Sequence, residues 1–153
     1  SAPFNKVNPE HNFIYIFDNS DPYYYQYKNT YELSNGKVIS KTLDIPKDNA
    51  YNSNRTIKDY PTMYIHDVKN DTSREITLSD AQKYELISGP SSPDGYTVGY
   101  VYGSFNLFDE ILLGGGSRNN GYYITKGNLQ KKLNMASPYT YYTGNFRIIG
   151  WVK

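Results

Sequence analysis

Cysteine is absent from this sequence of 153 residues. Its absence excludes disulfides, thiolate metal sites and a cysteine nucleophile. Long hydrophobic runs are absent as well, since no run approaches the length of about 18 residues that indicates a membrane-spanning helix. The opening residues, SAPFNKV, lack the charged and apolar regions of a signal peptide. We expect this start to be a processing or cloning boundary, with any membrane anchor outside the chain.

An excess of charge of either sign is also missing. The chain carries 16 basic and 15 acidic residues, which gives a net charge of +1, and they are spread along its length. Nucleic-acid binding requires a concentration of basic side chains. We therefore expect no nucleic-acid partner and no membrane insertion of this segment. The length suits one domain, residues 1–153, in which roughly two-thirds of the surface is buried on folding.

Strand patterns dominate what is present. Residues 12–18, NFIYIFD, are apolar throughout between polar ends, which predicts a strand covered on both faces. Three hairpins are predicted, around Asn35-Gly36, around residues 69–71 and around Gly127-Asn128, because these residue types tolerate the positive φ angles of tight turns. At the end of the chain, Phe146, Ile148, Gly150 and Val152 are expected to lie opposite Arg147, Ile149 and Trp151.

One helix interrupts the strands. Ser79 and Gln82 have the spacing of a capping box, and Gly89-Pro90 marks an end, so we expect a short helix near 79–88. The fold class is therefore all-β, with antiparallel hairpins in packed sheets and one short helix.

Three segments share the order strand, Asx or Gly turn, strand. Between the last two lies SPDG, residues 92–95. This pattern resembles the repeat of TolB-like and other WD40-like β-propellers, in which SPDG opens an inner strand and a hairpin forms the outer pair. The residues that carry the resemblance are Ser92, Pro93, Asp94, Gly95, Tyr64, Ile65, Asp67, Leu78, Tyr123, Ile124, Gly127 and Leu133. A blade needs about 40–45 residues and a ring about four blades, so the resemblance implies blade-like hairpins in a piece of an array or in an open stack.

The segment Gly114-Gly115-Gly116, followed by Ser117 and Arg118, raises the question of phosphate binding. A P-loop needs a lysine and a hydroxyl residue after its last glycine, and a dinucleotide fingerprint needs a glycine where Asn119 stands. A strand pattern follows rather than a helix, so the helix N-terminus that holds phosphate is missing. We interpret this segment as an exposed connection, and no cofactor is expected.

Signals for catalysis are weak. The only histidines are His11 and His66, and no G-x-S-x-G elbow is present. A hydrolase that acts on glycosides or esters, with carboxylates from distant segments, stays an alternative, and its candidate acids are Asp94, Asp109 and Glu110. A calcium loop at Asp18, Asn19 and Asp21 lacks the glycine and the bidentate glutamate of an EF-hand. An Asx-rich turn explains it equally well, and no metal site is predicted.

Tyrosine is the abundant residue, with 18 copies against six phenylalanines and one tryptophan. Tyrosine ladders can stack on sugars or peptides at a small entropic cost, although cross-strand pairing inside a sheet explains them as well. The candidate ligand contacts are Tyr23, Tyr25, Tyr27, Arg118, Tyr122, Tyr139 and Tyr141. The sequence thus favours a non-enzymatic recognition or scaffold domain of a bacterial surface or envelope protein that binds protein or glycan outside the cytoplasm. The remaining alternative is a structural domain that forms a homodimer through an open sheet edge.

Overall fold

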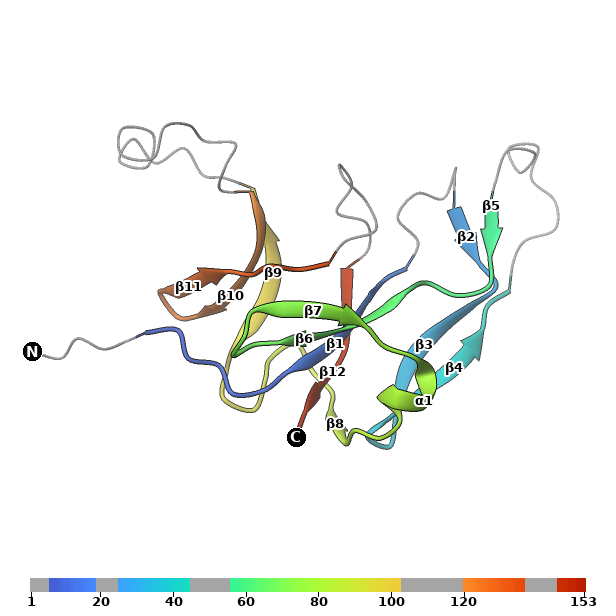
Figure 1. Ribbon diagram of the computed structural model, residues 1–153, viewed down its shortest axis with the longest axis horizontal. Coiled ribbons are helices and arrows are strands. Elements are labelled where there is room, and N and C mark those ends of the chain that lie inside the picture. Colours follow the sequence, from blue (N-terminus) through green and yellow to red (C-terminus); the bar gives the residue numbers. More distant parts are fainter. Residues whose placement is uncertain (1–5, 19–24, 45–55, 103–119, 137–145) are drawn as a thin grey trace, which may run out of the picture.

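The computed structural model describes residues 6–18, 25–44, 56–102, 120–136 and 146–153 (Figure 1). They form mainly antiparallel sheets with one short helix, which confirms the all-β class and the short helix. The central sheet has five strands in the order β7-β6-β1-β12-β8. Their bounds are β7 Thr72–Glu75, β6 Met63–Asp67, β1 Phe13–Phe17, β12 Phe146–Val152 and β8 Leu86–Ile87.

Strand β1 lies in the middle of this sheet, between β6 and β12. Every residue of β1 is at most 1% exposed. A strand buried on both faces has no reason to alternate with polar residues, and this explains the unbroken apolar run FIYIF. The prediction that this strand is covered on both faces is confirmed.

A three-stranded sheet covers one face of the central sheet. Its order is β11-β10-β9, with β9 Thr97–Val101, β10 Gly121–Lys126 and β11 Leu129–Lys132. Between the two sheets lies a mainly aromatic core, to which β1 contributes Phe13, Tyr15 and Phe17. Trp151 is also fully buried in this core. Most of the abundant tyrosine in the described segments is therefore core material or half-buried sheet surface.

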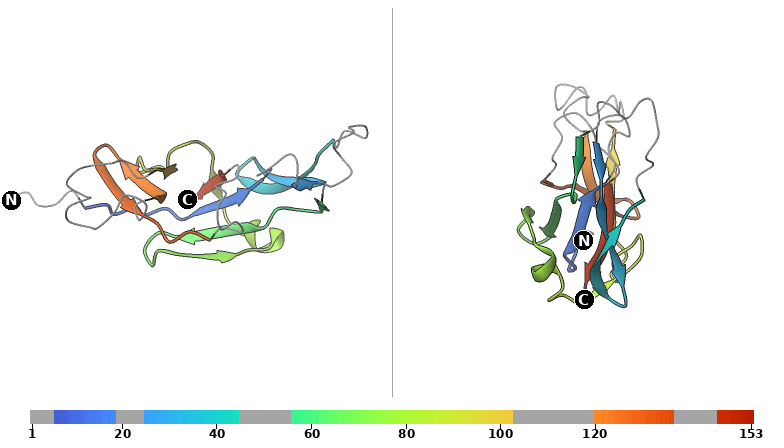
Figure 2. Two further views of the ribbon diagram at one scale, coloured as in Figure 1. Left: turned by 90° about the horizontal axis from the view of Figure 1, so that it is seen from above. Right: turned by 90° about the vertical axis from the view of Figure 1, so that its right-hand side faces the viewer.

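The other face of the central sheet packs against a hairpin and the helix. The hairpin consists of β3 Asn29–Ser34 and β4 Lys37–Thr42, and the helix is α1 Leu78–Ala81. The core on this side is mainly aliphatic, with Ile14 and Ile16 of β1 against Val38 of β4 and Ala81 of α1. Figures 1 and 2 show the three-stranded sheet and this hairpin toward the two ends of the long axis, with the central sheet between them. Two short strands, β2 Tyr25–Tyr27 and β5 Thr56–Lys58, pair in parallel.

All three predicted hairpins are confirmed. The β3–β4 turn places Asn35 and Gly36 at φ of 49° and 76°, as its Asn-Gly sequence predicts. The β6–β7 turn has Asp71 at φ 51°, and the β10–β11 turn has Gly127 at φ 58°.

The strict alternation predicted for the last strand is wrong because β12 contains a β-bulge. Ile14 pairs with Gly150 and Tyr15 with Ile148, so Ile149 is an extra residue. Beyond such an insertion the faces exchange. Trp151 therefore lies in the aromatic core with Phe146 and Ile148, whereas Ile149 lies in the aliphatic core.

The helix is shorter than the predicted segment and begins earlier. Thr77, not Ser79, is its N-cap, and the Thr77 hydroxyl accepts a hydrogen bond from the Asp80 amide at 3.1 Å. The segment that follows leaves the helix because Leu86 and Ile87 pair with β12 as β8. Sheet pairing at the edge therefore outweighs the helical pattern.

The described segments contain no helix that is long and apolar enough to cross a membrane. Nor do they show repeated four-stranded blades around a central channel, since their sheets have five, three, two and two strands. The SPDG segment does form a tight turn, in which the Ser92 hydroxyl accepts from the Tyr96 amide at 2.8 Å. The propeller resemblance stays a prediction.

Candidate functional site

The β6–β7 hairpin, at one edge of the central sheet, presents polar groups on both of its faces. His66 pairs with Ser73, and Ile65 pairs with Arg74. Because side chains alternate along a strand, His66 and Ser73 point to the aromatic core, whereas Ile65 and Arg74 point to the opposite side. One hairpin thus carries a buried polar network and an open hollow.

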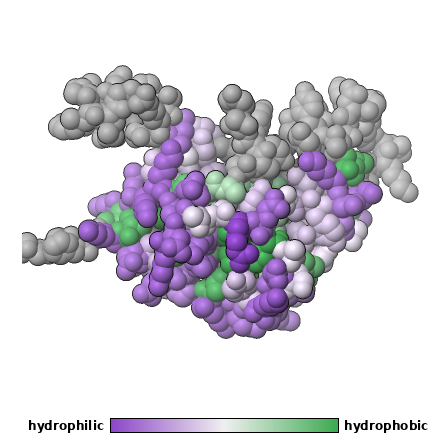
Figure 3. All heavy atoms as spheres, in the orientation of Figure 1, coloured by the Kyte–Doolittle hydropathy of each residue, from purple (hydrophilic) through white to green (hydrophobic). Residues whose placement is uncertain are grey.

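The hollow has a volume of about 270 Å³. Its lining consists of Asn12, Ile65, Asp67, Thr72, Arg74 and Tyr84, which come from the residues before β1, from both strands of the hairpin and from the turn after α1. Figure 3 shows strongly hydrophilic side chains over β7 beside a hydrophobic area. Ile65 is the only aliphatic residue of the lining, so the hollow is a polar surface.

The two charged groups of the hollow differ in how they are engaged. Asp67 Oδ1 accepts from the amides of Lys69 and Asn70, both at 3.0 Å, and its Oδ2 accepts from Asn70 Nδ2 at 2.8 Å. These bonds from Asn70 lower the pKa of Asp67, so its carboxylate is ionised near neutral pH. The Arg74 guanidinium makes no hydrogen bond or ion pair with any residue in the described ranges. Its donors are available to a ligand.

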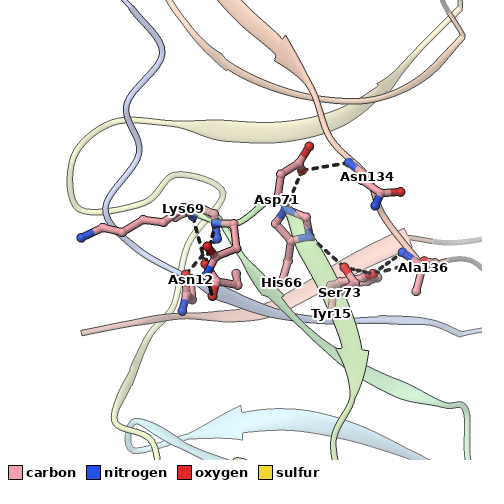
Figure 4. Close-up of polar contacts among 11 residues, drawn as sticks. Asn12, Tyr15, His66, Lys69, Asp71, Ser73, Asn134 and Ala136 are labelled. Atoms are coloured by element: carbon pink, nitrogen blue, oxygen red, sulfur yellow. Dashed lines mark hydrogen bonds and ion pairs between the residues drawn. The ribbon is translucent and has the colours of Figure 1, made fainter.

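The buried network on the other face centres on His66, which is 0% exposed (Figure 4). His66 Nδ1 lies 2.8 Å from Ser73 Oγ, and the Tyr15 hydroxyl donates to the same oxygen at 2.7 Å. His66 Nε2 lies 3.2 Å from Asp71 Oδ1 but has no hydrogen-bond partner among the described residues. We treat the contact with Asp71 as electrostatic for that reason.

The network ties three segments together. The Ala136 amide donates to the Tyr15 hydroxyl at 3.0 Å, and the Asn134 amide donates to Asp71 Oδ1 at 2.9 Å. Since Tyr15 belongs to β1 and Asp71 to the hairpin turn, residues 134–136 are fixed against both. Buried polar groups that are satisfied in this way rigidify a core.

Burial sets the protonation of this network. It lowers the pKa of His66, and the charge of Asp71 offsets part of that effect. Burial likewise raises the pKa of Tyr15 to about 12, and the hydrogen bonds that its hydroxyl makes with Ser73 and Ala136 oppose that rise. Both groups are therefore neutral at physiological pH.

Ser73, His66 and Asp71 have the residue types of an acyl-transfer triad, but their arrangement differs. In serine hydrolases the serine contacts Nε2 and the aspartate contacts Nδ1, whereas here the two contacts are reversed. The Tyr15 hydroxyl also donates to the serine oxygen that would have to attack. We interpret the cluster as a structural network.

The predicted ligand contacts fall into three groups. The side chains of Tyr27 and Tyr122 are buried, each with 7% exposure. Tyr122 packs against Phe17 and Phe146 in the aromatic core, with ring centroids 5.8 and 4.8 Å away. Tyr25 belongs to β2. The remaining candidates lie outside the described residues: Tyr23, Arg118, Tyr139 and Tyr141. The role of these candidates stays a prediction.

The candidate acids of the alternative hydrolase are only partly described. Partial burial raises the pKa of Asp94, but hydrogen bonds from the Ser92 hydroxyl and the Glu10 amide outweigh it, so the pKa is lowered overall. Asp94 thus stabilises the SPDG turn and binds the backbone of Glu10, which precedes β1. Asp109 and Glu110 lie outside the described residues.

Metal ligands do not gather in the described segments, where no group of three or more histidine or acidic side chains could hold an ion. Of the calcium-loop candidates, Asp18 is bound by Arg147, whose Nη2 and Nε donate to Asp18 Oδ2 at 2.8 and 3.1 Å. Asn19 and Asp21 lie outside the described residues.

Comparison with protein-family models, curated proteins and solved structures found no match. Any functional argument therefore depends on the geometry of the chain itself.

The hollow was not predicted from the sequence. Asn12, Arg74 and Tyr84 are isolated polar residues in three segments, and nothing in their spacing signals that they converge. The available signal was indirect: the predicted β6–β7 hairpin places Asp67, Thr72 and Arg74 on one face, opposite His66.

Proposed function

We propose that this chain is a non-enzymatic recognition domain of a bacterial surface or envelope protein, and that it binds a glycan or protein ligand outside the cytoplasm. The observation that carries the proposal is the hollow on the β6–β7 hairpin. Binding sites for small ligands combine a concave shape with a few polar groups whose hydrogen bonds are not used internally. Arg74 and the Thr72 and Tyr84 hydroxyls meet this description, since none of them bonds to another described residue.

Rigid surroundings support the same proposal. The hollow lies on a hairpin that pairs with β1, and the His66 network holds the opposite face of that hairpin in place. A ligand that meets preformed partners loses little binding free energy to the ordering of protein groups.

Exposed tyrosines offer additional contact surface. Tyr102 is 71% exposed and its ring lies 4.9 Å from that of Tyr100. Tyr31 and Tyr60 stack at 5.0 Å. Together with the predicted contacts Tyr23, Tyr139 and Tyr141, these rings can extend a binding surface for a longer glycan or peptide.

The test is a binding screen on a glycan array and a peptide panel, with the wild type beside the double variant Thr72→Val/Arg74→Gln. The matched control is Lys69→Gln, which removes an exposed cation of the same hairpin that does not line the hollow. Unchanged fluorescence of Trp151, the only tryptophan, verifies folding of each variant.

We expect at least one ligand that the wild type and the control bind and the double variant does not. A screen without any ligand, or a ligand that the double variant binds as well as the wild type, contradicts recognition through the hollow. Hydrolysis of the arrayed glycans or of ester substrates would contradict the non-enzymatic proposal and favour the hydrolase alternative.

A further inference from the structure

We infer that the hollow on the β6–β7 hairpin accepts a sugar ring that bears one carboxylate, as in a hexuronic acid. The inference rests on the proposed recognition function and names the ligand class for the same site. It follows from four properties of the lining. The lining has a guanidinium that can bind a ligand, an ionised carboxylate with one acceptor site left, and hydroxyls beside an aromatic ring. Its fourth property is that it contains little aliphatic surface.

The guanidinium of Arg74 selects an anionic group. Its five N–H donors form a planar fork that matches a carboxylate in a bidentate manner. Asp80, whose pKa Arg74 helps to lower, is already bound by Lys83 at 2.9 Å. Arg74 is thus a charged donor without an internal acceptor among the residues described.

Asp67 limits the charge that a ligand can bring. Its carboxylate is ionised and lines the same hollow as Arg74. A phosphate group, which carries about −1.5 to −2 charges at pH 7, would be repelled more strongly than a singly charged carboxylate. A carboxylate has about four acceptor sites, and three of those of Asp67 are used by Lys69 and Asn70. One site remains for a ligand hydroxyl.

The other polar groups suit a ring that carries hydroxyls. The Thr72 and Tyr84 hydroxyls can each donate and accept. Asn12 Oδ1 accepts from the Val68 amide at 3.0 Å, and its side-chain nitrogen, which donates to no residue in the described ranges, can donate to a ligand. The Tyr84 ring packs against the aliphatic core and lines the hollow, so it offers a fixed aromatic surface. Such a surface suits the apolar C–H groups of a sugar.

Size and polarity favour a sugar over the C-terminus of a peptide. A volume of about 270 Å³ lies just below the roughly 300 Å³ at which drug-sized pockets begin, which suits one ring. Peptide recognition relies on pockets for side chains in addition to contacts with the main chain. Ile65 is the only aliphatic residue of this lining, so the hollow offers little to an apolar peptide side chain.

The experiment compares methyl β-D-glucuronide with methyl β-D-glucoside by titration followed by NMR. The two sugars differ mainly in the carboxylate that takes the place of a hydroxymethyl group. A short peptide with a free C-terminal carboxylate and inorganic phosphate are titrated in parallel. Arg74→Gln is the test variant, and Lys69→Gln is the matched control because Lys69 is exposed on the same hairpin outside the lining.

We expect the glucuronide to bind the wild type at least about tenfold more tightly than the glucoside, the ratio that one charge-assisted contact produces. Arg74→Gln should remove this preference and Lys69→Gln should keep it. Equal affinity for the two sugars, or tighter binding of the peptide or phosphate, overturns the ligand class while the recognition function survives. If none of these probes binds and the array and peptide screen are also negative, both proposals fail.

Discussion

Acidification should destabilise the protein through His66. The folded state holds the imidazole in its neutral form, because burial lowers its pKa below the ordinary 6.5. The unfolded chain binds a proton near that ordinary value. The contribution of this group is therefore fully present above about pH 6.5 and is lost as the pH falls from there toward the lower pKa of the folded state.

The size of the effect follows from one proton. A single group changes the free energy of unfolding by at most about 1.4 kcal/mol per pH unit. Between pH 7.5 and 5.5 the upper limit for a pKa of 6.5 in the unfolded state is also about 1.4 kcal/mol, or roughly 3–6 °C in Tm. Asp71 at 3.2 Å and Asp67 favour the imidazolium, whereas Lys131 opposes it. The measured loss should therefore lie below this limit.

The assay is urea unfolding at pH 7.5 and 5.5, followed by the fluorescence of Trp151, which is 0% exposed in the folded state. The wild type should lose more stability between the two pH values than His66→Gln does. The second histidine, His11, is present in both proteins, so its titration cancels. Asp71→Asn provides a further check, because removal of the carboxylate should enlarge the loss. Equal pH dependence in the wild type and in His66→Gln would refute the reasoning.

Three further predictions concern packing and assembly. Tyr15→Phe should lower the free energy of unfolding by about 1–3 kcal/mol, because the Tyr15 hydroxyl bonds to Ser73 and Ala136 within the core. Tyr96→Phe should lower it less, since among the described residues that hydroxyl accepts from the Asn8 amide; equal losses in urea unfolding would contradict this. Gly150→Ala should lower the free energy of unfolding by about 1–3 kcal/mol, because the added Cβ would lie 2.9 Å from the Leu86 Cβ. Gly99→Ala should lower it far less in the same assay, because the added Cβ would have no atom within 4 Å. If the open edges of the central sheet pair two copies, light scattering at high concentration should give twice the monomer mass, and a monomer would exclude the homodimer alternative.

Local residue signals predicted most of the fold. Asn35-Gly36 specifies a turn through φ angles that few other residues tolerate, and the FIYIF run requires burial on both faces. Both are properties of adjacent residues, so they can be read without knowledge of the rest of the chain.

The bulge at Ile149 and the early end of α1 could not be read in the same way. Both depend on partners that are distant in the sequence. The bulge arises from the pairing of β12 with Ile14 and Tyr15 of β1. The helix ends early because Leu86 pairs with β12. Tertiary pairing of this kind outweighs local propensity.

The candidate site was less predictable than the fold. The tyrosine count suggested exposed ladders, but Tyr27 and Tyr122 are buried, because a phenol ring is a large apolar group that gains stability in a core. The hollow depends on the convergence of Asn12, Arg74 and Tyr84. That convergence is a consequence of packing, which no short motif encodes.

The most direct test of the central claim, that recognition occurs at the β6–β7 hollow, is a backbone amide NMR titration with methyl β-D-glucuronide. Signals of Asn12, Thr72, Arg74 and Tyr84 should shift together with one dissociation constant, and Arg74→Gln should abolish those shifts. Shifts confined to other regions, such as the surroundings of Tyr60 and Tyr102, or spectra that do not change, would contradict the assignment of the hollow as the binding site for this ligand.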